Sequence, residues 1–350
     1  METNIFLEVL SNSHGVSGYE CTLNDIITSE FKEYTDTIEV DKLGNIIALK
    51  AGTSNDNIKI MLAAHMDEIG LIVNHIEDDG LIRFVNIGGI DPRTILGQEV
   101  IVHGSKDIFG VIGTKPPHLQ DSSEKDKAIK IEDMSIDIGF SIDKVLEFVD
   151  IGDTITVKRR MINLENNRFA GKAMDDRAGL AVLYECMKEL SRINHEADVY
   201  FVSTVQEEVT MAGAITSSFR VTPDIGIAVD VGFGTTPELN HTNSIELGKG
   251  PGITLGGNIH PGLRSKLIEI AKEYNIPYQM EITVGPTGTD ARAMQINKEG
   301  MPALVLSIPL RYMHTSVEVV DMLDIKNSAK LLAFFIASIT KDNLEEILCY

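Results

Sequence analysis

The segment IKIMLAAHMDEIGLIV, residues 58–73, places ionisable side chains inside an otherwise apolar run. His65, Asp67 and Glu68 lie within four positions, directly after residues that are typical of a buried strand. Buried polar groups cost free energy unless other groups pair with them. The segment therefore predicts that charged groups from elsewhere in the chain, or a metal ion, pair with His65.

Polar residues also follow the other predicted strands of the chain. Glu207 and Glu208 follow VYFVSTV, Asp230 ends IGIAV, His314 follows ALVLSIPL, and Asp175 lies just before a helix that begins near Arg177. Ligands bind outside the carboxyl ends of the strands in open parallel sheets, so these side chains are expected to converge there. A cluster of carboxylates repels itself, and divalent cations are the usual compensation.

The residue types narrow the choice of cation. Imidazole with carboxylate and without thiolate suits zinc, cobalt or manganese. A mononuclear catalytic zinc keeps three protein ligands, so five candidates fit two divalent ions better, with Asp175 shared between them. The predicted sets are His65, Asp175 and Asp230 for one ion, and Asp175, Glu208 and His314 for the other.

Two further residues are predicted to act beside the ions. Asp67 lies two positions after His65 on an extended strand, so it projects to the same side and can accept the second N–H of the imidazole. Glu207 and Glu208 are adjacent and need different roles. We expect Glu208 to bind metal and Glu207 to act as the general acid/base for a bridging water. The chemistry predicted is hydrolysis of an amide.

The elements that carry these residues indicate an α/β fold with an insertion. Strands and helices alternate in residues 1–69 and again after residue 166, which predicts a mixed, mostly parallel sheet flanked by helices. Residues 70–165 contain short alternating runs broken by Gly and Asp, typical of an all-β, barrel-like module. Residues 118–133 are dense in charge and serine and are expected to form an exposed loop.

Composition excludes several classes of function. The 52 acidic against 31 basic residues give a formal charge of -21, which argues against nucleic acid or an anionic membrane as a partner. The three cysteines form no C-x-x-C pair, so neither a disulfide framework nor a thiolate zinc site is indicated. Without a basic, apolar leader or an apolar run of bilayer length, the sequence predicts a cytoplasmic protein.

The chain resembles metallopeptidase family 42, the tetrahedral (TET) and glutamyl-aminopeptidase-like enzymes, some of which were once labelled endoglucanases. The motifs that carry the resemblance span nearly the whole length: GVSGYE, DKLGN, AAHMDEIGLIV, GKAMDDRAG, STVQEEV, VDVG, TGTDA and SIPLRYMHT. The resemblance implies an aminopeptidase acting on peptides, with the five ligands above, Glu207 as base and Asp67 beside His65. It also implies dimerisation through the β-rich insertion and a hollow tetrahedron of twelve subunits. Thr210, in place of a usual Gly, and His14, in place of a frequent Pro, depart from the family pattern.

Two other functions remain as alternatives. A glycoside hydrolase is suggested by the pair Glu207 and Glu208, but glycosidase carboxylates flank the scissile bond roughly 5 to 9.5 Å apart and would leave the two histidines without a role. The other alternative is a metal-binding scaffold without turnover. Asp176 is expected either to cap the helix at Arg177 or to join the cluster, and Glu68 to lie at the domain junction. The histidines expected to be structural are His75, His103, His195, His241 and His260.

Overall fold

The computed structural model describes residues 1–54, 58–116, 118, 127–239 and 244–349. Residues 119–126 of the predicted exposed loop, and also His241, lie outside the described residues. Among the helices that are described, none is both long enough and apolar enough to cross a membrane.

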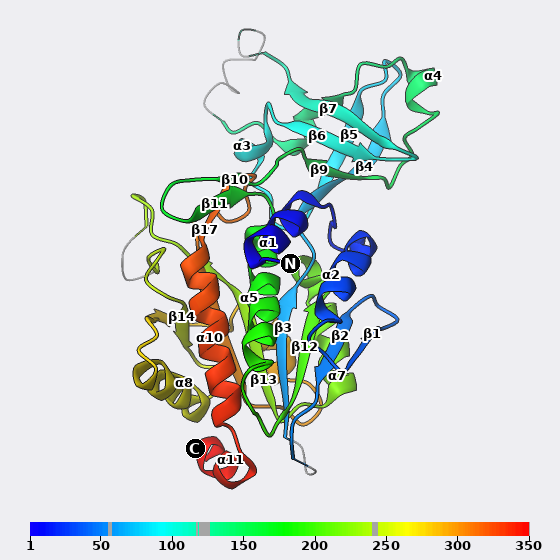
Figure 1. Ribbon diagram of the computed structural model, residues 1–350. Helices are drawn as coiled ribbons and strands as arrows, with labels where there is room; N and C mark the ends of the chain where they lie inside the picture. The colour runs from blue at the N-terminus through cyan, green and yellow to red at the C-terminus, as the bar shows by residue number, and fades with distance from the viewer. Residues whose placement is uncertain (55–57, 117, 119–126, 240–243, 350) are drawn as a thin grey trace.

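A mixed sheet forms the centre of the molecule (Figure 1). Within the described residues it has eight strands in the order β1-β2-β12-β3-β13-β16-β14-β15. The four central strands run parallel to one another, and strands of the opposite direction flank them. The bounds are β1 Thr37–Val40, β2 Ile46–Lys50, β3 Lys59–His65, β12 Asp198–Thr204, β13 Ile225–Phe233, β14 Gly252–Leu255, β15 Gln279–Ile282 and β16 Ala303–Leu310.

Helices cover both faces of this sheet. Strand β3 is buried from Ile60 to His65 and β16 along its whole length, which explains why their sequences are nearly continuous apolar runs. Figure 1 shows α1, α5 and α10 in front of the sheet and α7 behind it. The α-helices are α1 Thr3–Asn12, α2 Asn24–Phe31, α3 Pro92–Ile95, α4 Ile142–Val145, α5 Met174–Leu190, α6 Glu207–Thr210, α7 Ala212–Val221, α8 Pro261–Glu273, α9 Asp290–Gln295, α10 Met322–Ser338 and α11 Lys341–Leu348. Two 3₁₀ helices are η1 Glu20–Leu23 and η3 Ile131–Asp133.

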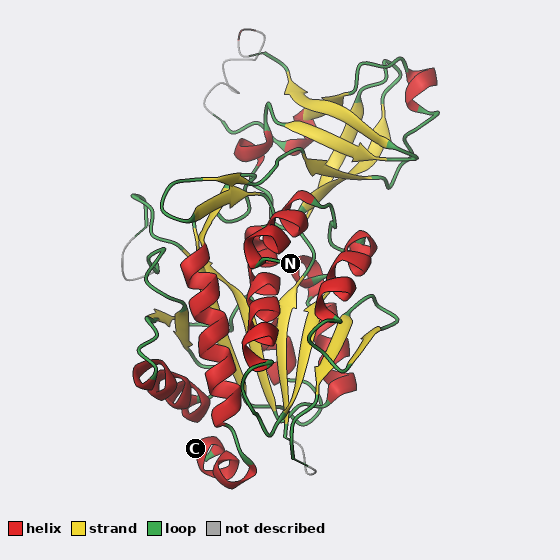
Figure 2. Ribbon diagram, in the orientation of Figure 1, coloured by secondary structure: helices red, strands yellow, loops and turns green. Residues whose placement is uncertain are grey.

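A closed β-barrel stands at the end of the molecule opposite the C-terminus (Figure 2). Its strands pair in the order β4-β5-β8-β7-β6-β9 and enclose an apolar core of their own. Only the four-residue helices α3 and α4 and the short η3 interrupt these strands within the described residues. The strands are β4 Gly70–Ile76, β5 Ile82–Ile87, β6 Glu99–His103, β7 Asp107–Thr114, β8 Met134–Asp137 and β9 Thr154–Val157. The predicted fold class, an α/β sheet with a barrel inserted, is confirmed.

A small antiparallel sheet joins the segment after the barrel to the C-terminal part of the chain. It consists of β10 Ile162–Asn163, β11 Arg168–Gly171 and β17 Glu318–Asp321 in that order. Strand β11 leads into α5 and β17 leads into α10. The small sheet therefore fixes the start of α5 relative to the loop that carries His314.

Candidate metal centre

The carboxyl ends of the parallel strands set several site residues in one row. Thr204 of β12 is the register partner of His65 of β3. On the other side of β3, Ala228 of β13 pairs with Ala63, so Asp230 is two residues further on and level with His65. Because neighbouring strands lie about 4.8 Å apart, side chains in one row can reach a common point above the sheet edge.

Asp175 reaches this row from the irregular start of α5. Asp175 and Asp176 have non-helical backbone angles, and the peptide bond between them is cis. One carboxylate oxygen of Asp176 accepts the Gly179 N–H at 2.9 Å, and the other accepts the His65 N–H at 3.2 Å. Asp176 therefore caps the regular part of the helix, which was one of its two expected roles, and also anchors the end of β3.

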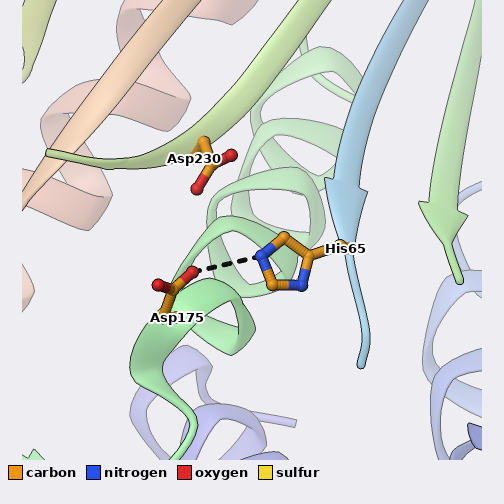
Figure 3. Close-up of side chains that lie close together, drawn as sticks. All are labelled: His65, Asp175 and Asp230. Carbon is orange, nitrogen blue, oxygen red and sulfur yellow. Dashed lines mark hydrogen bonds and ion pairs between the residues drawn. The ribbon is translucent and has the colours of Figure 1, made fainter. Parts of the chain in front are cut away.

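The first group of potential ligands consists of His65, Asp175 and Asp230. Their donor atoms lie within 4.8 Å of one another. His65 Nε2 is 3.1 Å from Asp175 Oδ1, and Figure 3 shows the Asp230 carboxylate facing the same space from β13. All three side chains are buried.

The second group consists of Asp175, Glu208 and His314, again with donor atoms within 4.8 Å. His314 Nε2 lies 3.4 Å from Asp175 Oδ2 and 3.3 Å from Glu208 Oε1. Asp175 thus faces both groups, one with each oxygen. The structure brings all five residues together in the two sets that the sequence suggested. Their role as metal ligands stays a prediction.

Asp67 is buried beside His65 and also contacts the turn that carries the two glutamates. His65 Nδ1 lies 3.1 Å from the Asp67 backbone carbonyl and 3.5 Å from the carboxylate Oδ1. The carboxylate also accepts the N–H groups of Glu207 at 3.0 Å and Glu208 at 3.1 Å. Asp67 therefore connects the imidazole of His65 to the turn that carries both glutamates.

The side chain of Glu207 projects toward the first group. Its Oε2 lies 3.9 Å from His65 Nε2, and its Oε1 is buried without a hydrogen-bond partner. Glu207 opens the short helix α6, after Gln206 in the left-handed conformation (φ 58°). This sharp turn separates the directions of Glu207 and Glu208, which accounts for their different neighbours.

The electrostatics of the cluster favour a bound cation. Desolvation raises the pKa of Glu207 to about 10, with Asp230, Asp290 and Glu208 adding repulsion. Desolvation, together with the charge of Asp175, also raises the pKa of Asp230 well above its usual value. Hydrogen bonds to Asp175 and Glu208 raise the pKa of His314 to about 11. The carboxylates repel one another unless positive charge lies among them.

Sequence reasoning missed Glu318 and Asp290. Glu318 is buried, and it accepts the Asp175 N–H at 3.2 Å and the His314 N–H at 2.8 Å, so it positions the residue that the two groups share and the histidine of the second group. A glutamate inside the apolar run SVEVV was the available signal. Asp290, in the motif TGTDA, accepts the Thr204 hydroxyl at 2.5 Å at the same sheet edge.

Glu68 lies where the sequence placed it, between the α/β sheet and the barrel. Its carboxylate forms a buried ion pair with Lys172 at 2.7 Å and accepts the Gly15 N–H at 3.1 Å. Of the histidines expected to be structural, His103 of the barrel is bonded to Asp107 and Thr156 and stacks on His14. Neither Glu68 nor His103 belongs to the two ligand groups.

Comparison with known proteins identifies the family. The family model described as M42 glutamyl aminopeptidase matches residues 44–331. The lysyl aminopeptidase of Pyrococcus furiosus is 42% identical over 93% of this chain and 94% of its own length.

Solved structures agree with the sequence matches. A TET aminopeptidase from a marine sediment thaumarchaeon superposes with a TM-score of 0.94 at 33% identity, covering 99% of this chain and 98% of that one. The TET1 peptidase of Pyrococcus horikoshii, described as assembling into a tetrahedron or a large octahedral shell, gives a TM-score of 0.85 at 33% identity over 97% and 100%. This chain therefore belongs to the M42 family of aminopeptidases.

Proposed function

We propose that the protein is a dinuclear metal-dependent aminopeptidase that hydrolyses N-terminal residues from short peptides. The observation that carries this proposal is the pair of ligand groups that share Asp175. A single catalytic ion would need only three of the five side chains. Two groups built around one carboxylate match the pattern of a two-ion hydrolase site.

The donor set fits two divalent cations. Each group offers one imidazole nitrogen and carboxylate oxygens, and neither contains a thiolate. This set suits zinc or cobalt best, and also manganese. Peptidases of this family are metal-dependent. When bound, the ions would lower the pKa of a shared water and polarise the scissile carbonyl.

Glu207 would move the proton. Its Oε1 has no hydrogen-bond partner among the described residues, and its Oε2 lies near His65, so the carboxylate borders the space where a water would attack. We assign Glu207 the removal of a proton from that water and its delivery to the leaving amine. Asp67 keeps Glu207 in place through the backbone N–H.

Self-association forms part of the proposal. The barrel, which we assign to residues 70–165, would mediate dimers, and dimers would assemble into a twelve-subunit tetrahedron. The P. horikoshii relative supports this, since it is described as assembling into a tetrahedron. Apolar residues exposed on the barrel surface, including Phe109 and Val111, give additional support.

The direct test is metal removal with measurement of peptide hydrolysis. Release of N-terminal amino acids from tripeptides should fall to background after dialysis against a chelator, and should return when zinc or cobalt is added. The restored metal content should approach two ions per subunit. Full activity in the metal-free sample would contradict the proposal. Sugar release from soluble cellulose that is independent of metal would favour the glycosidase alternative.

A further inference from the structure

A cleft of about 480 Å³ opens beside the ligand groups. His65, Asp175, Glu207 and Asp230 line one side of it. The other walls come from β13, β14, β15 and the segment that follows β15. If the cluster holds the reacting bond, the rest of this cleft receives the side chain of the N-terminal residue.

Besides Glu207, a second carboxylate in this cleft has no part in the two ligand groups. Glu281 of β15 accepts hydrogen bonds from the hydroxyls of Thr254, at 3.0 Å, and Ser307. Ser307 is the register partner of Asp230 on the neighbouring strand. Glu281 is therefore held within a short distance of the first ligand group, on the same face of the sheet edge.

A glycine makes room for the Glu281 carboxylate. Gly232 lies two residues after Asp230 on β13, so the two positions face the same side of the strand. A Cβ atom at Gly232 would be 2.6 Å from Glu281 Oε1, a distance that real Cβ contacts do not show. The absence of a side chain at Gly232 lets the Glu281 carboxylate lie against β13.

Glu281 has no basic partner in the part of the chain that the structure describes. Among the described residues, no Lys or Arg forms an ion pair with it, and no Lys or Arg lines the cleft. The hydroxyls of Thr254 and Ser307 orient the carboxylate but carry no charge. Apolar side chains, including Val231, Ile245 and Met280, line the space around it. An aliphatic stem with a positive end complements such a lining.

We propose that Glu281 selects peptides whose N-terminal residue is Lys or Arg. This rests on the proposed aminopeptidase function. The stem of the substrate side chain would contact the apolar wall, and its ammonium or guanidinium would bind the carboxylate that Thr254 and Ser307 orient. Glu281 is then a specificity residue for the substrate side chain.

The test compares lysine with norleucine, which has a similar aliphatic stem without the charge. With tripeptides of the form X-Ala-Ala, wild-type kcat/KM for Lys should exceed that for norleucine by about tenfold or more, the size of one modest charge-assisted contact. Glu281→Gln should lower kcat/KM for the Lys and Arg tripeptides by about tenfold and leave kcat/KM for the norleucine tripeptide unchanged. Glu281→Lys should instead favour an N-terminal Glu. Glu273→Gln, an exposed residue at the end of α8, is the matched control and should change none of these values.

The outcomes separate the two proposals. Hydrolysis of the norleucine tripeptide by Glu281→Gln shows that the variant is folded. The ratio of kcat/KM for the Lys tripeptide to that for the norleucine tripeptide therefore measures only recognition of the side chain. Equal wild-type values for Lys and norleucine, or an unchanged ratio in the variant, would overturn the role of Glu281 and leave the aminopeptidase function intact. Comparison of wild-type hydrolysis of Lys and Nε-acetyl-lysine substrates tests the same charge without any variant. Failure to hydrolyse every peptide would remove the proposed function and this inference with it.

Discussion

Glu207 combines a buried carboxylate, a near contact with His65 and one oxygen without a hydrogen-bond partner. Replacing Glu207 by Gln keeps the shape of the side chain and removes its ability to take a proton. We expect kcat to fall by about 10²- to 10⁴-fold, the usual contribution of a general base. Metal content, measured by elemental analysis, should remain at the wild-type value because Glu207 belongs to neither ligand group.

An exposed glutamate provides the control for this variant. Glu299→Gln makes the same chemical change on the surface and should leave kcat and metal content unaltered. Near wild-type turnover in Glu207→Gln would show that another group moves the proton. Loss of metal together with turnover would instead place Glu207 among the ligands.

The residues that follow strands could be predicted from sequence, and the residues that hold them could not. His65 and Asp230 end apolar runs, and Glu208 and His314 follow apolar runs; the carboxyl end of a parallel strand has a known location. Glu318 was missed because it acts from 143 residues away on the backbone of Asp175. A contact of this kind depends on the pairing of β17 with β11, for which the local pattern of residues gives no signal.

At the scale of elements, the turn that carries both glutamates depends on a close approach by α7. The Gly213 N–H donates to the Val205 carbonyl at 3.0 Å, and Asn45 Oδ1 accepts the Val205 N–H at 3.1 Å. A Cβ atom at Gly213 would lie 2.4 Å from the backbone N and O of Val205. The helix can therefore pack against the end of β12 only with glycine at this position.

Gly213→Ala should disturb the catalytic turn from outside the site. The added methyl group must displace Val205 or the start of α7, which we expect to cost about 1–3 kcal/mol of stability. The shift should also reduce kcat, because only Gln206 separates Val205 from Glu207 and Glu208. Thermal unfolding and peptide hydrolysis measure the two effects.

A second glycine supplies the comparison for this variant. At Gly113, on the barrel strand β7, an added Cβ would meet nothing within 4 Å. Gly113→Ala should therefore leave the melting temperature and kcat near the wild-type values. Equal behaviour of the two variants would show that the approach of α7 to Val205 does not position the turn.

The kinds of element were more predictable than their arrangement. Continuous apolar runs indicated buried parallel strands, and alternating short runs indicated the barrel; both interpretations are confirmed. The order of strands in the sheet was not predicted, because β2 and β12 pair across some 150 residues of intervening chain. The cis bond after Asp175 and the kinked start of α5 also had no signal in the sequence.

At the scale of the whole molecule, the sheet and the barrel enclose separate apolar cores. The ligand groups lie at the sheet edge that faces the barrel, where Glu68 and Lys172 form a buried ion pair. Removing one partner of a buried pair leaves an uncompensated charge, so this contact helps to fix the barrel relative to the site. Assembly through the barrel would therefore also set the surroundings of the cleft.

The outer face of β7 gives this assembly a specific test. Phe109 and Val111 are 65% and 50% exposed on a strand that is already paired on both sides. The Lys158 ammonium lies over one face of the Phe109 ring, 4.3 Å from its centroid, and the exposed apolar surface that remains can meet another subunit. Aspartate at both positions would place unpaired charges in such an interface, which is costly. Light scattering should show a smaller particle for the double variant than for the wild type, while hydrolysis of tripeptides per subunit persists. Val40→Asp changes an equally apolar exposed residue on the edge strand β1 and should keep the wild-type mass. An unchanged mass in the double variant would exclude this face of the barrel from the subunit interface.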